Sequence, residues 1–155
     1  KYLLDMTRHT PRDFFQLLSC IQKYHKDNRL KHSEVRSGLR DYSLKYFQPE
    51  IQDELSGYAE VEEIEAFFSC VSVIGKRDFS YSELRSTWLK ERGDSTDEVL
   101  EAICKAIFDC SAIGNITRSG GHTHYNFKYR NRLSSFSQNK GIMLHRGLWK
   151  AMNVP

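Results

Sequence analysis

Two groups of residues in this 155-residue chain have the types and spacing needed to bind phosphate. The first centres on Arg12 in the run Thr10-Pro11-Arg12-Asp13. Thr10 suits the N-cap of a helix, Pro11 suits its first position, and Asp13 suits the positive end of its dipole. We therefore expect Arg12 at a rigid helix start, where a guanidinium can contact phosphate through two N–H groups. The alternative is a surface arginine in a local salt bridge.

The second group combines basic and aromatic side chains near the C-terminus. Tyr125, Phe127 and Tyr129 alternate with polar residues there. This composition suits phosphate contact together with base stacking. In the alternative interpretation the aromatic side chains pack on helices and the basic ones rest on acidic helices. The candidate nucleic-acid-binding residues are the basic ones without acidic neighbours: Arg118, Lys128, Arg130, Arg132 and Lys140.

Other chemistry is poorly supported by the sequence. His122 and His124 would share one face of a strand, but a metal site needs a third ligand, for which His145 is the only obvious candidate, so we predict none. No Ser/His/Asp or Cys/His arrangement stands out, and we nominate no catalytic residue. The phosphate-binding motif G-x-x-x-x-G-K-[ST] does not occur. We therefore expect that this chain is not an enzyme by itself.

Cysteine usage and hydropathy indicate the class of protein. The four cysteines lie in apolar-periodic segments without a C-x-x-C pair, which is typical of reduced core residues. No apolar run approaches the length needed to span a bilayer, and no signal peptide is evident. We predict a cytoplasmic protein with no membrane partner. The cysteines are Cys20, Cys70, Cys104 and Cys110.

The formal net charge of +3 conceals a strong segregation of charge along the chain. Residues 1–47 carry ten Lys/Arg and five Asp/Glu, residues 48–113 carry six and fifteen, and residues 114–155 carry seven and none. Such segregation predicts distinct surfaces with distinct partners. The alternative is that the oppositely charged blocks pair with one another inside the fold.

Apolar periodicity predicts the elements that must position these residues. Helices are expected over about 11–24, 33–47, 59–74, 81–92 and 94–111, with Pro49 ending the second and Ser80 capping the fourth. The period then changes to that of a β-hairpin, with strands over 113–118 and 123–129 around Gly120-Gly121. A short extended piece and a small helix are expected in the final segment.

This order predicts a mainly α protein with a small β-hairpin wing. Three helices followed by a hairpin is the order of a winged helix, which would cover about 57–130. It would follow a helical lid-like segment over 1–47 and precede a basic C-terminal tail with a short helix over 131–155. The expected recognition helix, 94–111, has five carboxylates and one basic residue, Lys105, so its insertion among DNA phosphates would be repulsive.

Four short motifs carry a family resemblance that spans nearly the whole chain. Together they resemble the C-terminal lid plus winged-helix region of a bacterial AAA+/STAND-like P-loop ATPase family of poorly known role. The motifs are Thr7 with Pro11-Arg12-Asp13, the pair Tyr42-Ser43, Ile113-Gly114-Asn115 and His145-Arg146-Gly147-Leu148.

The resemblance implies that Arg12 is the lid arginine, called sensor 2, that reaches the γ-phosphate of ATP bound to the core domain. ATP and Mg²⁺ would then be cofactors of a longer protein, of which this chain, beginning without methionine, is a piece. Its partners would be the ATPase core and a protein or nucleic acid bound by the winged helix. The main alternative is a free-standing winged-helix transcription regulator that contacts DNA through the wing and the basic tail.

Overall fold

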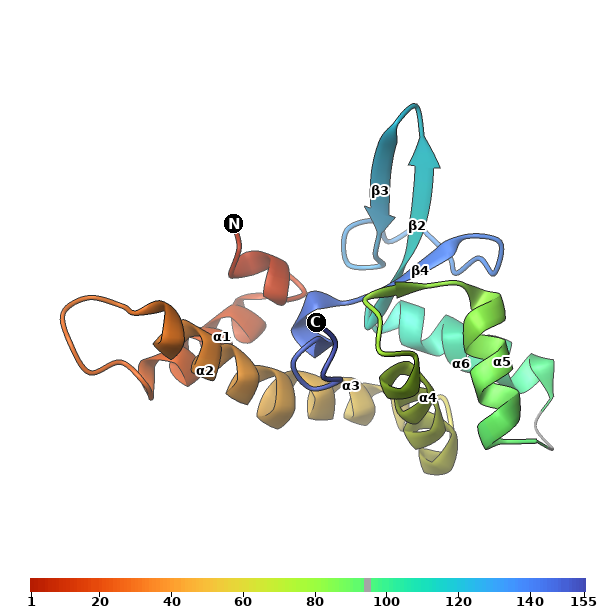
Figure 1. Cartoon of the computed structure of the whole chain (residues 1–155), viewed down its shortest axis with the longest axis horizontal. Helices are drawn as coiled ribbons and strands as arrows, with labels where there is room; N and C mark the ends of the chain where they lie inside the picture. Colours follow the sequence, from red (N-terminus) through yellow and green to blue (C-terminus); the bar gives the residue numbers. More distant parts are fainter. Residues whose placement is uncertain (94–95) are drawn as a thin grey trace.

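The computed structural model describes residues 1–93 and 96–155 and is mainly α with a small antiparallel sheet, as predicted (Figure 1). The α-helices are α1 (Pro11–Gln22), α2 (His32–Tyr42), α3 (Gln48–Leu55), α4 (Val61–Ile74), α5 (Tyr81–Glu91) and α6 (Asp97–Asp109). The strands are β1 (Asp78–Phe79), β2 (Ile113–Ser119), β3 (His122–Asn126) and β4 (Gly141–Leu144). Three short helical segments are η1 (Leu4–Met6), the π-helical η2 (Ser43–Phe47) and η3 (Arg146–Leu148).

Helices α1 and α2 form a helical hairpin that projects from one end of the molecule (Figure 1). The predicted start of α1 is confirmed, because the Thr10 hydroxyl accepts the Asp13 N–H and Pro11 occupies the first turn. Gly38 of α2 lies against the backbone of Ile21, where a β-carbon would come within 2.5 Å of the Ile21 Cα. The absence of a side chain at this position therefore sets the close approach of the two helices.

The second helix is longer than the sequence predicts. Helical structure runs without interruption from α2 through η2 and α3, so the prediction that Pro49 ends it is wrong. Proline lacks the N–H that an interior α-helical residue donates. Here the turn before it is widened, with the Gln48 N–H bonded to the Ser43 carbonyl five residues back, and Pro49 falls in the first turn of α3. A π-helical turn thus accommodates the proline.

Helices α4, α5 and α6 pack on one another, α6 contacts α3 of this long helix, and all three follow their predicted ranges closely (Figure 1). Gly75 ends α4 in a left-handed conformation with φ of 63°. The Ser80 cap is confirmed, since its hydroxyl accepts the Glu83 N–H at the start of α5. The prediction for the next helix began at Asp94, which lies with Ser95 outside the described residues; α6 begins at Asp97, after Thr96.

The predicted β-hairpin is confirmed and forms part of a larger sheet. Strands β2 and β3 pair from Asn115–Asn126 to Ser119–His122, and the turn uses positive φ at Gly120 and Gly121. Strand β4 adds to the other edge of β2, and β1 adds to β4, giving the order β1-β4-β2-β3. Residues 130–155 thus supply the predicted extended piece, β4, and the small helix, η3. The winged-helix assignment itself stays a prediction.

One apolar cluster joins the helices with strands β1, β2 and β4 and extends in sequence from Met6 to Val154. Its largest fully buried side chains include Tyr42, Phe47, Phe67, Trp88 and Phe108. The four cysteines are also buried and unpaired, in keeping with their expected core positions. Leu18 of α1, by contrast, is 39% exposed. Within the described ranges, no helix has the length and apolar character needed to cross a membrane.

We predict that Gly38→Ala destabilises the protein by about 1–3 kcal/mol, because the added methyl overlaps the Ile21 backbone and must push α1 away from α2. Urea unfolding followed by circular dichroism measures the change. Gly57→Ala is the matched control, since a β-carbon there meets nothing within 4 Å. Equal stability of the two variants would contradict the close helix contact.

Candidate functional site

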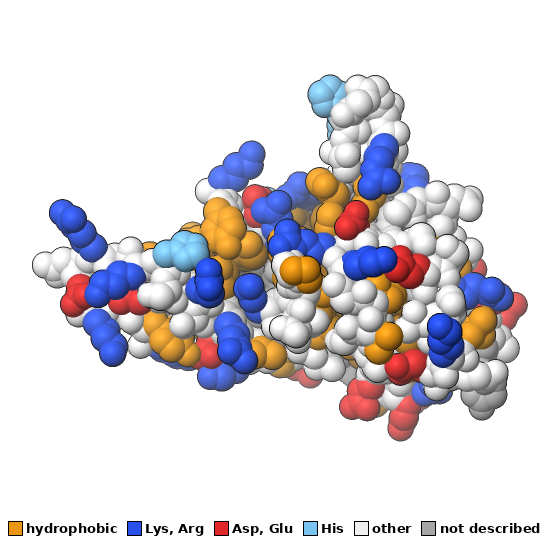
Figure 2. Space-filling model, in the orientation of Figure 1, with side chains coloured by type: hydrophobic (Ala, Val, Ile, Leu, Met, Phe, Trp, Pro, Cys, Tyr) orange, Lys and Arg blue, Asp and Glu red, His pale blue; other side chains and the backbone are white. Residues whose placement is uncertain are grey.

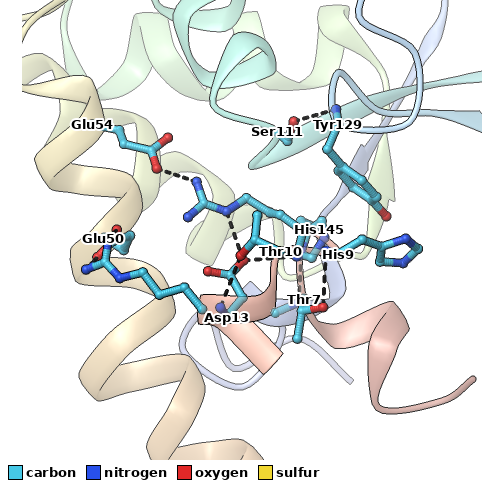
Figure 3. A network of polar contacts seen from close by, with 12 residues as sticks. Thr7, His9, Thr10, Asp13, Glu50, Glu54, Ser111, Tyr129 and His145 are labelled. Atoms are coloured by element: carbon cyan, nitrogen blue, oxygen red, sulfur yellow. Dashed lines mark hydrogen bonds and ion pairs between the residues drawn. The ribbon is translucent and has the colours of Figure 1, made fainter. Parts of the chain in front are cut away.

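A network of polar contacts surrounds the start of α1 (Figure 3). Asp13 is only 1% exposed, and its carboxylate accepts hydrogen bonds from the backbone N–H of Arg8 (3.1 Å) and from Nε of Arg8 (3.2 Å). The Tyr46 hydroxyl donates to the same carboxylate at 2.9 Å. The guanidinium of Arg8 also pairs with Glu54 of α3. The buried pair of Arg8 with Asp13 therefore ties the residues before α1 to that helix, and the contacts with Tyr46 and Glu54 tie both to the long helix.

The electrostatics of this pair favour its charged form. Burial opposes ionisation of Asp13, but the Arg8 hydrogen bonds and charge outweigh it, so the pKa of Asp13 lies below its usual value. Burial likewise opposes the charge of Arg8, yet its bonds to Asp13 and Glu54 raise its pKa overall. Burial and the hydrogen bond to Asp13 raise the pKa of Tyr46 to about 12, so its hydroxyl remains a donor.

Arg12 directly precedes Asp13 in the first turn of α1, but its side chain faces solvent. Its side chain is 68% exposed, whereas that of Arg8 is 11% exposed. Two N–H groups of Arg12 meet the two carboxylate oxygens of Glu50 at 2.7 and 3.1 Å, and the guanidinium lies 5.8 Å from the centre of the Tyr46 ring. The structure therefore places Arg12 in a two-pronged pair with a carboxylate, the geometry that a phosphate would also accept.

His145 connects this region to the C-terminal part of the chain. Its ring stacks on Phe47 with centroids 4.8 Å apart, and Nδ1 accepts the Gly147 N–H at 3.0 Å. Burial, reinforced by the nearby Arg8 charge, lowers the pKa of His145 to about 3. The imidazole is therefore neutral near pH 7 and serves as a core side chain, where the sequence had offered it as a third metal ligand beside His122 and His124.

The structure separates the five basic residues predicted to bind nucleic acid. Lys128 and Arg132 line a shallow groove together with Arg12, but this groove also contains carboxylates such as Glu50 and Asp109. Lys128 pairs with Asp109 at 3.3 Å. Lys140 is exposed in the loop before β4. The remaining two, Arg118 and Arg130, lie near Asp78 and Asp5 respectively.

A second cluster of cations lies where the hairpin meets the C-terminal turn. Arg77, Arg130 and Arg146 line a cleft of about 410 Å³ together with aromatic side chains. We call it the basic–aromatic cleft and define it by Arg77, Tyr125, Phe127, Tyr129, Arg130, Met143, Arg146 and Trp149. Figure 2 shows Lys and Arg side chains gathered between the N-terminal segment and the projecting hairpin. Sequence analysis missed Arg77, Arg146 and Trp149, which come from separate segments and meet only in the fold.

Some residues of the oppositely charged blocks of the sequence form ion pairs with one another in the fold. Basic residues of the first block meet the acidic block in the pairs of Arg8 with Glu54 and Arg12 with Glu50. The last block meets it in the pairs of Arg118 with Asp78 and Lys128 with Asp109. In residues 1–93 and 96–155, no group of three or more His, Cys, Asp or Glu side chains is arranged to hold a metal ion.

Comparisons with known proteins find no likeness from which to assign a function. The chain matches no protein-family model, no curated protein and no solved structure.

We predict that Asp13→Asn costs about 3 kcal/mol or more of stability, because removing one partner of a buried ion pair leaves the other uncompensated. Chemical denaturation at pH 7 measures the loss. The control is Asp27→Asn, whose partner Lys31 and whose own side chain are 60% and 56% exposed, so its loss should stay below about 1 kcal/mol. A small loss for Asp13→Asn would show that the pair is not structural.

We also predict that acid destabilises the protein partly through His145. Below pH 6.5 the unfolded chain binds a proton at this residue and the folded chain does not, so stability falls as the pH drops toward 3, by up to about 1.4 kcal/mol per unit. His145→Asn retains an acceptor for the Gly147 N–H and does not titrate. Urea unfolding at pH 7, 6 and 5 should give a shallower dependence for this variant, and an unchanged dependence would contradict the buried neutral state.

Proposed function

We propose that residues 1–155 form the C-terminal regulatory and interaction module of a P-loop ATPase, with Arg12 contacting the nucleotide that the core domain binds. The observation that carries this proposal is the contrast between two neighbouring arginines. Arg8 is committed to a buried structural pair, while Arg12 is exposed on the first turn of the helix that this pair anchors. An exposed guanidinium on an anchored turn suits phosphate contact.

The pair between Arg12 and Glu50 supports a role in signalling nucleotide state. A nucleotide triphosphate carries more negative charge than one carboxylate, so it competes with Glu50 for the same two N–H groups. Glu50 lies on α3, in the helix continuous with η2 and α2. Exchange of Glu50 for phosphate would break the Arg12 contact between α1 and α3, while the Arg8–Glu54 pair stays in place, and so would couple the nucleotide to α3.

In this proposal the remaining part of the module docks a partner.

The second candidate function is a free-standing regulator that binds DNA through the hairpin and the basic residues after it. The exposed Arg118 and Arg130 favour it. Against it, α6 carries Asp97, Glu98, Glu101 and Asp109, and its single basic residue, Lys105, already pairs with Glu101 at 2.7 Å. In the major groove, the carboxylates of such a helix would repel the DNA phosphates and so weaken binding.

The test is ATP hydrolysis by the complete gene product that contains residues 1–155. Arg12→Ala should lower the turnover number at least about tenfold, because the arginine would stabilise charge on the transferred phosphoryl group. Arg12→Lys should recover only part of it, since lysine lacks the planar fork. Arg36→Ala, which removes an exposed arginine from α2, is the control.

Two results would refute the proposal. One is a complete coding sequence without a G-x-x-x-x-G-K-[ST] motif upstream of Lys1. The other is an Arg12→Ala enzyme that hydrolyses ATP as fast as the wild type.

A further inference from the structure

We propose that the basic–aromatic cleft binds single-stranded nucleic acid. This site does not involve Arg12 or the nucleotide of an ATPase core, and it goes beyond the function proposed above. The cleft lies along strands β3 and β4 at the base of the hairpin and is bounded by η1 and by the turn that follows β4. Three features support the proposal: ordered aromatic surfaces, excess positive charge and the small volume of the cleft.

Trp149 provides the first aromatic surface. Its indole N–H donates to the Leu144 carbonyl at 2.9 Å, which fixes the orientation of the ring. The guanidinium groups of Arg77 and Arg146 lie 4.1 and 5.5 Å from the ring centre. A base stacked near this indole would have two cations beside it to meet the neighbouring phosphates.

Tyr125 of β3 and Tyr129, which follows the end of that strand, provide a second aromatic surface in the cleft. Tyr125 of β3 is 44% exposed, and Tyr129 lies beneath the guanidinium of Arg130 at 5.5 Å. Aromatic side chains that stack successive bases, interleaved with arginines that meet the backbone, are typical of single-strand binding surfaces. Two such surfaces in one cleft suit consecutive bases of a strand better than a single nucleotide.

The charges of the cleft are only partly compensated. Arg130 and Arg146 share one carboxylate, that of Asp5, at 3.5 Å from each. Arg77 contacts the Pro155 main-chain oxygen and the Trp149 ring, and no Asp or Glu side chain pairs with it within the described residues. Asp78 on the cleft floor lies 3.9 Å from Arg118. The cleft therefore retains an excess of positive charge that suits a phosphate backbone.

The shape of the cleft favours a single strand over a duplex. Its volume is about 410 Å³, and Tyr125 of the β2–β3 hairpin forms part of its lining. Unpaired bases can turn into such an opening and stack, whereas bases within a duplex are already stacked on one another. Among the described residues, the lining comes from the sheet, from η1 and from the C-terminal turns, and its carboxylates are those of Asp5 and Asp78.

Fluorescence anisotropy with a labelled 15-nucleotide oligo(dT) strand tests the proposal on the chain of residues 1–155. We expect micromolar affinity at 50 mM salt that weakens steeply as salt increases. The double variant Arg77→Ala/Arg146→Ala should bind at least tenfold more weakly, and its slope of log affinity against log salt should fall by about 1.4, since each phosphate contact to a single strand contributes about 0.7. Tyr125→Ala should weaken binding about fivefold without changing the slope, because it removes stacking and no charge.

The double variant Arg36→Ala/Arg40→Ala is the matched control, because it removes two exposed arginines from α2 and leaves the cleft intact. Its affinity should stay within twofold of the wild type, and thermal melting should show that every variant is folded. The proposal is overturned if oligo(dT) does not bind at 50 mM salt, or if the two double variants lose affinity equally. It is also overturned if a 15-base-pair duplex, polyglutamate or ATP binds at least as tightly as the single strand.

Discussion

The buried pair between Arg8 and Asp13 is the interaction on which the arrangement of the functional residues depends. Asp13 belongs to the first turn of α1, and it receives bonds from the preceding segment and from Tyr46 on η2. Arg8 extends the connection to Glu54 on α3 and lies 5.6 Å from the centre of the Phe47 ring. Two charges so deeply enclosed are stable only while both remain paired. The start of α1 is therefore fixed with respect to the long helix, and Arg12 is fixed with it.

Local features of the fold could be predicted from the sequence, and distant contacts could not. The Thr10 and Ser80 caps and the Gly120-Gly121 hairpin depend on neighbouring residues, so composition and spacing reveal them. The path of the helix through Pro49 depends on a π-turn stabilised by packing in the core. The pairing of β1 and β4 joins residues more than sixty positions apart, for example Asp78 and Met143, and no local pattern indicates it.

The candidate sites show the same difference between local features, which the sequence predicts, and distant contacts, which it does not. Arg12 could be nominated because its helix start is encoded by adjacent residues. Asp13 was assigned only to the helix dipole, since nothing in the sequence shows that Arg8 would share its burial. Arg77 and Arg146 could not be grouped with Arg130, because their proximity requires the sheet order β1-β4-β2-β3. Charge segregation thus indicated that separate surfaces exist, but only the fold shows which basic residues are paired and which line a cleft.

Amide hydrogen exchange at Arg8 and Asp13 tests most directly whether the start of α1 is rigid. The Arg8 N–H donates to the Asp13 carboxylate and the Asp13 N–H to the Thr10 hydroxyl, both at 3.1 Å. If the buried pair fixes this region, both amides should exchange only through global unfolding, with the same protection free energy as the amides of Leu17 and Ile21 in the core. Exchange at the rate of an open loop would contradict the account, because Arg12 would then lack a fixed position.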